Sequence, residues 1–149
     1  FELPQMKVAG LNITRQNSTT VDTSGNTMYL IEGYNYQDYY MTAVNTTLAA
    51  NTSQNYYNLF TFDGNYIYSV ARQAYLTGTT GSISFVATGT SYSRSTIGSA
   101  NNCRFLWSYR SNNTYYIRQS DSTTAAMSSA SESPFRRQWM LYTVTYDIP

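Results

Sequence analysis

Short runs of apolar and aromatic residues follow one another along the chain, and clusters of Asn, Gly, Ser and Asp separate them. The runs are rich in Tyr, Phe, Ile, Val and Thr, the residue types that favour β-strands. No window of about eleven to eighteen residues shows the i, i+3, i+4, i+7 spacing of an amphipathic helix. The pattern therefore predicts an all-β domain, with candidate strands at 28–35, 39–44, 47–51, 57–62, 65–71, 74–78, 82–88, 103–109, 114–119, 125–130 and 138–146.

The clearest turn in the chain is FDGN at 62–65, between two of these runs. The Asp-Gly pair is expected to supply the positive φ angles of a tight two-residue connection. The sequence therefore predicts a β-hairpin at this position.

The runs also recur in a threefold pattern, with copies at about 29–62, 66–109 and 115–146. Each copy opens on a Tyr-rich strand that holds an aliphatic residue, passes through a polar turn, and reaches a second long apolar residue. A short third strand follows in the first two copies and is hard to see in the third, near 133–137. Each copy closes on an aromatic-rich strand. The predicted core positions are Leu30 and Met41, Ile67 and Leu76, and Ile117 and Met127.

Four strands in each of three copies give the arrangement of a β-trefoil. One four-stranded unit cannot bury its apolar face alone, whereas three units around a common axis cover one another. The second copy carries a long insertion at 88–102, TGTSYSRSTIGSANN. An antiparallel β-sandwich or jelly roll is the alternative fold.

The pattern YLIEGYN…YYMTA, YIYSVA…AYLTG and YYIRQS…AAMSS, with its closing aromatic strands, resembles the β-trefoil superfamily over residues 28–146. The resemblance implies a six-stranded barrel capped by three hairpins. It also implies a role like that of the lectins and carbohydrate-binding modules of secreted and surface proteins, although cytokine-like and inhibitor trefoils share the fold. Ricin-type lectins repeat Gln-x-Trp, but Gln138 directly precedes Trp139 here, so no family site is transferred.

Residues 1–27 lie outside the repeat and are interpreted as an N-terminal lead-in or linker, with a strand or extended segment at its start. Residues 28–149 form the predicted trefoil domain. The chain has no signal peptide and does not begin with Met. We therefore expect a mature or excised domain that is linked to further domains of a parent chain.

Charged residues make up only 11% of the chain, and the net charge is +1 with nine scattered basic residues. The chain therefore lacks the clustered basic residues that would favour binding to nucleic acid or acidic lipid. No apolar run is long enough for membrane insertion. The lone Cys103 excludes an intrachain disulfide and is interpreted as a small apolar residue next to a strand. An uncharged polar exterior of Ser, Thr, Asn and Tyr favours a secreted or surface-exposed protein.

Catalysis is difficult to build from these residues. The chain has no histidine, which removes the commonest general base and metal ligand. Its eight carboxylates lie mostly in turns, in the lead-in or at the C-terminus, without an evident strand-borne pair of the kind that glycosidases use. The sequence predicts a non-enzymatic protein with no cofactor and no metal site.

Binding is the more natural use of the sixteen tyrosines, more than a barrel of this size can bury. A surface tyrosine offers an apolar face beside a hydroxyl, which suits either a glycan or a surface protein. The polar turns of the three copies are the predicted ligand-binding positions. They are Tyr36, Asp38 and Tyr40 in the first copy, Arg72, Gln73 and Tyr75 in the second, and Arg118, Asp121 and Ser122 in the third.

Among these turns the first is favoured, because a carboxylate and aromatic rings coincide there. Arg136 and Arg137 are candidates to clamp an anionic group such as a sialic acid carboxylate, or else to blunt a loop edge before the last strand. The leading hypothesis is an extracellular module that binds carbohydrate or docks a larger protein on a surface. The alternatives are the receptor-binding head of a viral or phage fibre and a structural protein-interaction domain.

Overall fold

The computed structural model describes residues 11–16, 18–44, 48–52, 54–79, 81–129 and 133–146. Within these ranges it contains thirteen β-strands and three short 3-10 helices. No helix in this described part is long and apolar enough to cross a membrane. The strands are β1 (Leu11–Arg15), β2 (Met28–Gly33), β3 (Tyr40–Thr42), β4 (Ala49–Asn51), β5 (Phe60–Asp63), β6 (Tyr66–Ser69), β7 (Ala74–Thr79), β8 (Ser82–Val86), β9 (Ser93–Ile97), β10 (Arg104–Arg110), β11 (Thr114–Asp121), β12 (Thr124–Ser129) and β13 (Trp139–Tyr146), and the 3-10 helices are η1 (Tyr56–Asn58), η2 (Ala100–Asn102) and η3 (Pro134–Arg137).

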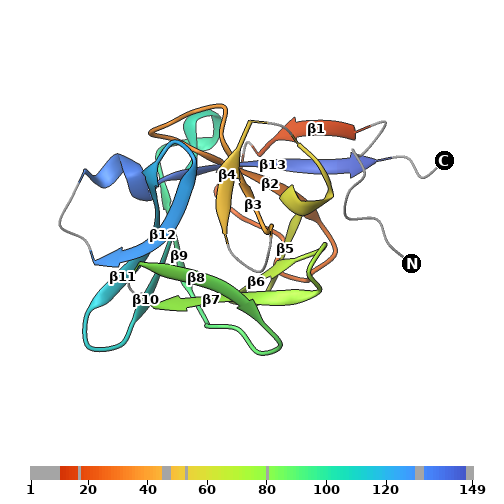
Figure 1. The fold of residues 1–149 in the computed structure, drawn as a ribbon. Helices are drawn as coiled ribbons and strands as arrows, with labels where there is room; N and C mark the ends of the chain where they lie inside the picture. Colours follow the sequence, from red (N-terminus) through yellow and green to blue (C-terminus); the bar gives the residue numbers. More distant parts are fainter. Residues whose placement is uncertain are drawn as a thin grey trace.

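A closed barrel of seven strands forms the centre of the molecule (Figure 1). Its hydrogen-bonded neighbours are, in order, β13, β10, β11, β12, β4, β3 and β2, and β2 pairs with β13 again to close the ring. β5 to β8 continue from β2 as successive antiparallel pairs, and β6, β7 and β8 lie in the lower part of Figure 1. β1 adds to β13, and β9 adds to β10. The all-β class predicted from the sequence is confirmed.

The β2–β13 pair is covered on both of its faces. Successive residues of a strand point to opposite sides, and five of the six residues of β2 are buried. Tyr29 and Ile31 face the main core cluster, whereas Leu30 packs with Leu59 and Val144 in a second, smaller cluster. β2 therefore separates two packed layers.

Large aromatic side chains fill the main core. The rings of Phe62 and Trp107 stack with their centroids 5.5 Å apart and their planes 12° apart. Trp139 is fully buried at the start of β13, and its indole N–H donates to the carbonyl of Ile117 over 3.0 Å. A buried indole N–H needs such an acceptor, since leaving it unpaired costs about 1 to 3 kcal/mol.

All six predicted core positions of the repeat are buried. Met41, Ile67, Leu76, Ile117 and Met127 all lie in the main cluster. Leu30 is also fully buried, but it packs in the second, smaller cluster, because the register of β2 against β13 turns Ile31 and not Leu30 toward the main core. A strand buried on both faces shows no alternation that would reveal which face is which.

The trefoil itself is not confirmed. The closed barrel runs through seven strands, where the resemblance implied six. The described residues of 28–146 do contain twelve strands, but the first copy holds four, the second five and the third three, in place of four each. The lead-in supplies β1, in agreement with the strand expected there, while β9 lies in the segment that was predicted to be an insertion. Near 133–137 the third copy has the 3-10 helix η3, with Pro134 at its first turn, in place of a short strand.

The hairpin predicted at 62–65 is present between β5 and β6. Asp63 pairs with Tyr66, so that Gly64 and Asn65 form the two-residue loop. Of these two, Gly64 has a φ of 59° and Asn65 does not have a positive φ. The positive φ at the first loop position is the feature of a type II′ turn, which requires glycine there.

Candidate functional site

Three tyrosines gather on the outer side of the β6–β7 hairpin. In β6, Ile67 and Ser69 are buried, so Tyr66 and Tyr68 point the other way. Tyr75 of β7 lies opposite Tyr68 in the strand register. Its ring meets the rings of Tyr66 and Tyr68 edge-on, at centroid distances of 5.5 and 5.0 Å.

A carboxylate joins this group. The Tyr75 hydroxyl donates to Asp63 Oδ2 over 3.2 Å, and this hydrogen bond is the main reason that the pKa of Tyr75 is raised. Asp63 is exposed at the last position of β5. Tyr75 thus stays a neutral hydroxyl at ordinary pH, and Asp63 presents an anionic acceptor beside it.

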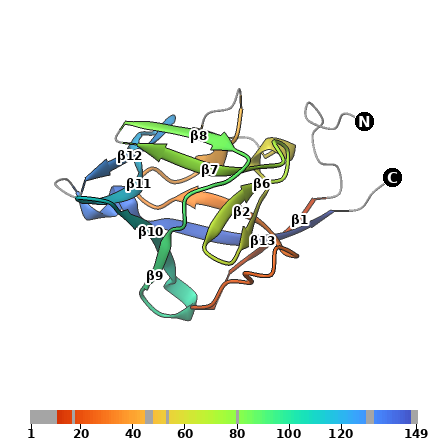
Figure 2. The same cartoon turned by 90° about the horizontal axis from the view of Figure 1, so that it is seen from below.

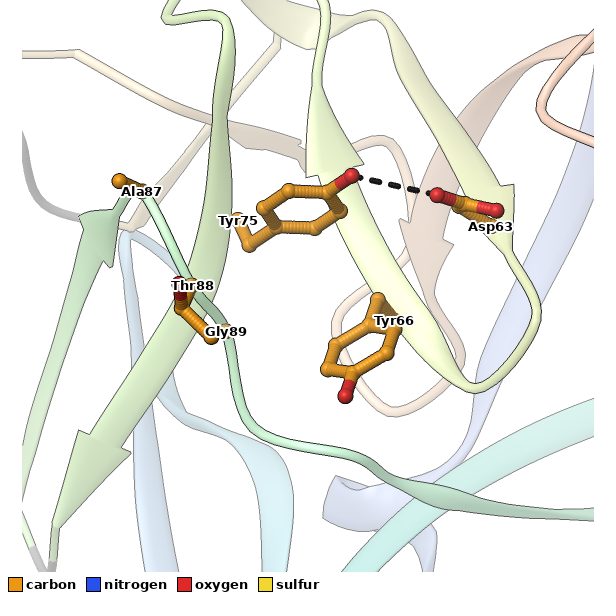
Figure 3. Close-up of a pocket in the computed structure, with 6 residues that line it drawn as sticks. All are labelled: Asp63, Tyr66, Tyr75, Ala87, Thr88 and Gly89. Atoms are coloured by element: carbon orange, nitrogen blue, oxygen red, sulfur yellow. Dashed lines mark hydrogen bonds between the residues drawn. The ribbon is translucent and has the colours of Figure 1, made fainter.

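The tyrosines and Asp63 line an open pocket of about 240 Å³, which is completed by the segment after β8 (Figure 3). Its lining residues are Asp63, Tyr66, Tyr75, Ala87, Thr88 and Gly89. In Figure 3 the ring of Tyr75 lies between the segment that holds Gly89 and the carboxylate of Asp63.

Glycine is required at position 89 because the chain passes against Tyr75. A Cβ built on Gly89 would lie 2.4 Å from the Cβ of Tyr75 and 3.0 Å from the carbonyl oxygen of Leu76. The contact is with atoms close to the backbone, which have little room to move. The absence of a side chain at Gly89 therefore allows the segment after β8 to lie directly against Tyr75, where it forms one side of the pocket.

The pocket combines an apolar surface with hydrogen-bonding groups of both kinds. Tyr66 is 37% exposed and offers its ring, the Tyr75 hydroxyl and Thr88 offer polar groups, and Asp63 accepts hydrogen bonds. Asp63 is the single acid among the six lining residues. The pair of facing carboxylates that glycoside hydrolysis uses is thus not present in this pocket.

Of the nine predicted ligand-binding residues, Tyr75 lines this pocket and the other eight do not. In the first copy, Asp38 and Tyr40 both lie near Glu32, and burial together with the charges of Glu32 and Asp38 raises the pKa of Tyr40, whereas Tyr36 is directed elsewhere. Tyr36 contacts Arg136 near η3, whereas Tyr40 packs its ring on Tyr142 at 6.3 Å. Asp38 is exposed with a φ of 70°, and its backbone N–H donates to Glu32 Oε2 over 2.6 Å.

Arg72 and Gln73 hold a turn. The Arg72 guanidinium donates from Nε to the carbonyl of Ala43 over 2.7 Å and lies on the ring of Tyr57 at 5.0 Å. Gln73 is exposed in the β6–β7 connection with a φ of 51°, and its N–H donates to Ser69. Both residues therefore stabilise the β6–β7 connection in which they lie.

Asp121 and Arg118 also lie apart from the pocket. Asp121 accepts hydrogen bonds from the backbone N–H and the hydroxyl of Thr123, at 2.9 and 3.2 Å, and the backbone bond is the main cause of its lowered pKa. This arrangement stabilises the β11–β12 turn. Arg118 is half-buried on β11, opposite Ala126 of β12, and Ser122 lies in the turn itself.

A buried carboxylate that the sequence did not single out lies near β2. Glu32 is 4% exposed and accepts hydrogen bonds from the Tyr142 hydroxyl, over 2.5 Å, and from Asp38. Arg15 donates to the same hydroxyl over 2.8 Å. Burial and the hydrogen bond to Glu32 raise the pKa of Tyr142. Because both Glu32 oxygens are used internally, this network ties β1, β2 and β13 together.

The sequence contained a signal for Asp63 and Tyr66 that was not used. A two-residue turn at 64–65 places residues 63 and 66 directly opposite each other, which joins a carboxylate to an aromatic ring. The FDGN pattern predicts the hairpin, but by itself it does not predict that Asp63 lies in a binding pocket. No local sequence pattern predicts that residues 87–89 line the pocket. Their position depends on how the chain passes back across β7 after β8.

No protein-family model matches the chain, and no curated protein matches it with significant sequence similarity. The functional assignment therefore depends on the geometry of the described residues.

Proposed function

We propose that this domain binds carbohydrate, without catalysis, through the pocket formed by Tyr66, Tyr75 and Asp63. The observation that carries the proposal is the exposed ring of Tyr66 beside the Tyr75–Asp63 hydrogen bond. The apolar C–H face of a sugar ring packs on an aromatic side chain, while its hydroxyls need paired donors and acceptors. This pocket offers both within one short hairpin.

The size of the pocket favours a single sugar ring or a chain end. Sites that enclose a drug-sized ligand have volumes of roughly 300 to 1,000 Å³. At about 240 Å³, and open to solvent, this pocket is smaller than that range. A ligand would lie on the tyrosines and remain partly exposed, as expected for weak binding that repeated sites or a larger parent protein would strengthen.

The setting of the domain is part of the same proposal. A low content of charged residues and an exterior of hydroxyls and amides support a secreted or surface-exposed module within a larger protein. A β-trefoil relationship is supported by the pairings β2–β13, β2–β5, β5–β6 and β10–β11, and by the residues that each repeat contributes to the main core. The β10–β13 pairing and the seven-stranded closure are departures from the ideal trefoil.

A glycan array probed with the 149-residue chain tests the proposal, followed by titration calorimetry with the strongest neutral ligand. Tyr66→Ala should weaken binding at least about fivefold, because truncating a central aromatic anchor costs more than about 1 kcal/mol. Tyr75→Phe, which removes one hydroxyl, should weaken it less.

Ile13→Ala is the matched control. It removes a similarly exposed apolar side chain, 44% exposed on β1, which does not line the pocket, and should leave the affinity unchanged. Silence across a diverse array, or equal effects of Tyr66→Ala and Ile13→Ala, would contradict the proposal.

A further inference from the structure

A second surface surrounds η3, built from three arginines and three tyrosines that come from distant parts of the chain. Tyr34 and Tyr36 follow β2, Arg104 begins β10, and Tyr116 lies on β11. η3 itself contributes Arg136 and Arg137. We call this surface the arginine–tyrosine face, and in Figures 1 and 2 η3 lies at the end of the molecule away from β6.

Each arginine of the face is packed over a tyrosine ring. The guanidinium carbon of Arg104 lies 4.3 Å from the ring centroid of Tyr34, that of Arg137 lies 4.5 Å from Tyr116, and that of Arg136 lies 5.7 Å from Tyr36. All six side chains are half-buried. Stacking restrains a guanidinium while leaving the N–H groups at its edge available for a ligand.

Among the described residues, the acceptors of Arg104 and Arg136 are neutral groups. Arg104 donates to the side-chain oxygen of Gln138 over 2.8 Å and to the carbonyl of Asn102. Arg136 donates to the carbonyl of Ser120 over 3.0 Å and to the hydroxyl of Tyr36 over 3.2 Å. None of these acceptors carries charge, so they orient the guanidinium groups without neutralising them.

Arg137 supplies a second, independent observation. Its Nε–H is buried and has no hydrogen-bond partner within the described residues. Leaving such a group unpaired is unfavourable, and native structures contain few of them.

We infer that the arginine–tyrosine face binds an acidic glycan, through sulfate or carboxylate oxygens held by Arg104, Arg136 and Arg137. The planar guanidinium fork matches both groups in a bidentate manner. Phe135, which is 50% exposed on η3 and packs near Tyr34 with centroids 6.0 Å apart, adds an apolar surface beside the charges. This site is separate from the tyrosine pocket, and the inference does not depend on the proposed function.

The small number of basic residues on this face favours an acidic glycan over nucleic acid as the ligand. Nucleic-acid binding depends on a wide basic surface that neutralises several phosphates. This chain has a net charge of only +1, and the face presents three arginines together. A few anionic groups on an otherwise neutral sugar chain match that number better.

The test uses three polymers with one backbone: dextran, carboxymethyl dextran and dextran sulfate. The arginine–tyrosine face of the 149-residue chain should bind carboxymethyl dextran, dextran sulfate or both, and it should not bind uncharged dextran. Comparing the two charged polymers shows whether the face prefers carboxylate or sulfate. Arg137→Gln should weaken binding about five- to tenfold, and Arg137→Lys should restore it only in part, because lysine keeps the charge without the planar fork.

Arg110→Gln is the matched control, since Arg110 is exposed at the β10–β11 hairpin and, among the described residues, its guanidinium makes a long contact to the Thr114 hydroxyl at 3.5 Å. It should change the affinity less than twofold. Tyr66→Ala should leave binding of the charged polymers intact, which separates this inference from the tyrosine pocket. Thermal melting of each variant establishes that it is folded.

Three results would overturn the inference. They are absence of binding to both charged polymers, equal losses in Arg137→Gln and Arg110→Gln, and binding to single-stranded DNA as tight as to the charged dextrans. The last result would assign the face to phosphate chains.

Discussion

Replacing Gly33 with alanine should destabilise the domain through one specific collision with Gln119. A Cβ built on Gly33 would lie 2.0 Å from Cδ of Gln119, and the three nearest atoms all belong to that amide. Gln119 is fully buried on β11. Its amide accepts from the Tyr36 backbone N–H over 3.1 Å and donates to the Tyr36 carbonyl over 3.0 Å, in the manner of a neighbouring strand. The glycine leaves the space that this amide occupies.

The size of the effect follows from these two hydrogen bonds. An alanine at position 33 displaces the Gln119 amide, and each buried polar group left unsatisfied costs about 1 to 3 kcal/mol. We expect Gly33→Ala to lower the free energy of unfolding by about 2 to 4 kcal/mol. At about 3 °C per kcal/mol for a chain of this length, the melting temperature should fall by about 6 to 12 °C.

A double-mutant cycle isolates the collision. Gln119→Ala alone should cost a similar amount, because it removes the same two hydrogen bonds. Gly33→Ala should then cost less than about 1 kcal/mol in the Gln119→Ala background, since the obstructing amide is gone. Urea unfolding monitored by tryptophan fluorescence measures all four proteins. Equal costs of Gly33→Ala in both backgrounds, or a neutral effect in the parent protein, would refute this reasoning.

Three further predictions follow from single positions. Burial is the main reason that the pKa of Tyr92 is raised above its ordinary value, so its contribution to stability is complete below about pH 10 and falls as the pH rises further. Tyr92→Phe should make the decline of unfolding free energy above about pH 10 shallower, and an unchanged slope in urea titrations would count against it. Gly64→Ala should cost about 1 kcal/mol in urea unfolding, because the φ of 59° favours glycine; a neutral result would show that the turn has changed its type. The Cys103 thiol is 3% exposed, and burial raises its pKa, so it should react with a thiol reagent far more slowly in the native protein than in urea; equal rates would contradict its burial.

Most of the strands and the β5–β6 hairpin were predictable because they depend on local composition. Apolar runs bounded by turn residues mark most of the barrel, and the glycine at position 64 marks a connection that few other residues permit. β9 was not predictable in this way, since Ser93–Ile97 contains almost no apolar residues and is mostly exposed. It is a strand because it pairs with five residues of β10, which is a tertiary contact.

The faces of the strands were harder to predict than the strands themselves. In β2, Leu30 and Ile31 are both fully buried, so hydrophobicity alone does not assign either of them to the barrel interior. The register against β13 decides, and it depends on the whole closed sheet. The same limit applies to η3, where Pro134 excluded a regular strand but did not specify a 3-10 helix.

The sequence predicts which residue types form the candidate sites, but not which individual residues come together in space. An excess of tyrosine indicates surface rings, and Tyr75, one of the predicted ligand-binding residues, lies in a hairpin where its ring contacts those of Tyr66 and Tyr68. Tyr36 and Arg136 are 100 positions apart in the chain, so their contact follows only from the closed barrel. Turn positions such as Asp38 and Asp121 attracted attention for their charge, but their contacts stabilise the turns themselves.

Chemical-shift mapping of the ¹⁵N-labelled 149-residue chain, titrated with the strongest neutral glycan from an array, tests the central claim most directly. The account predicts that the amide signals of Tyr66, Tyr75, Thr88 and Gly89 move together with one dissociation constant, while signals of η3 stay in place. Shifts confined to other parts of the barrel, or no shifts with any neutral glycan, would contradict it.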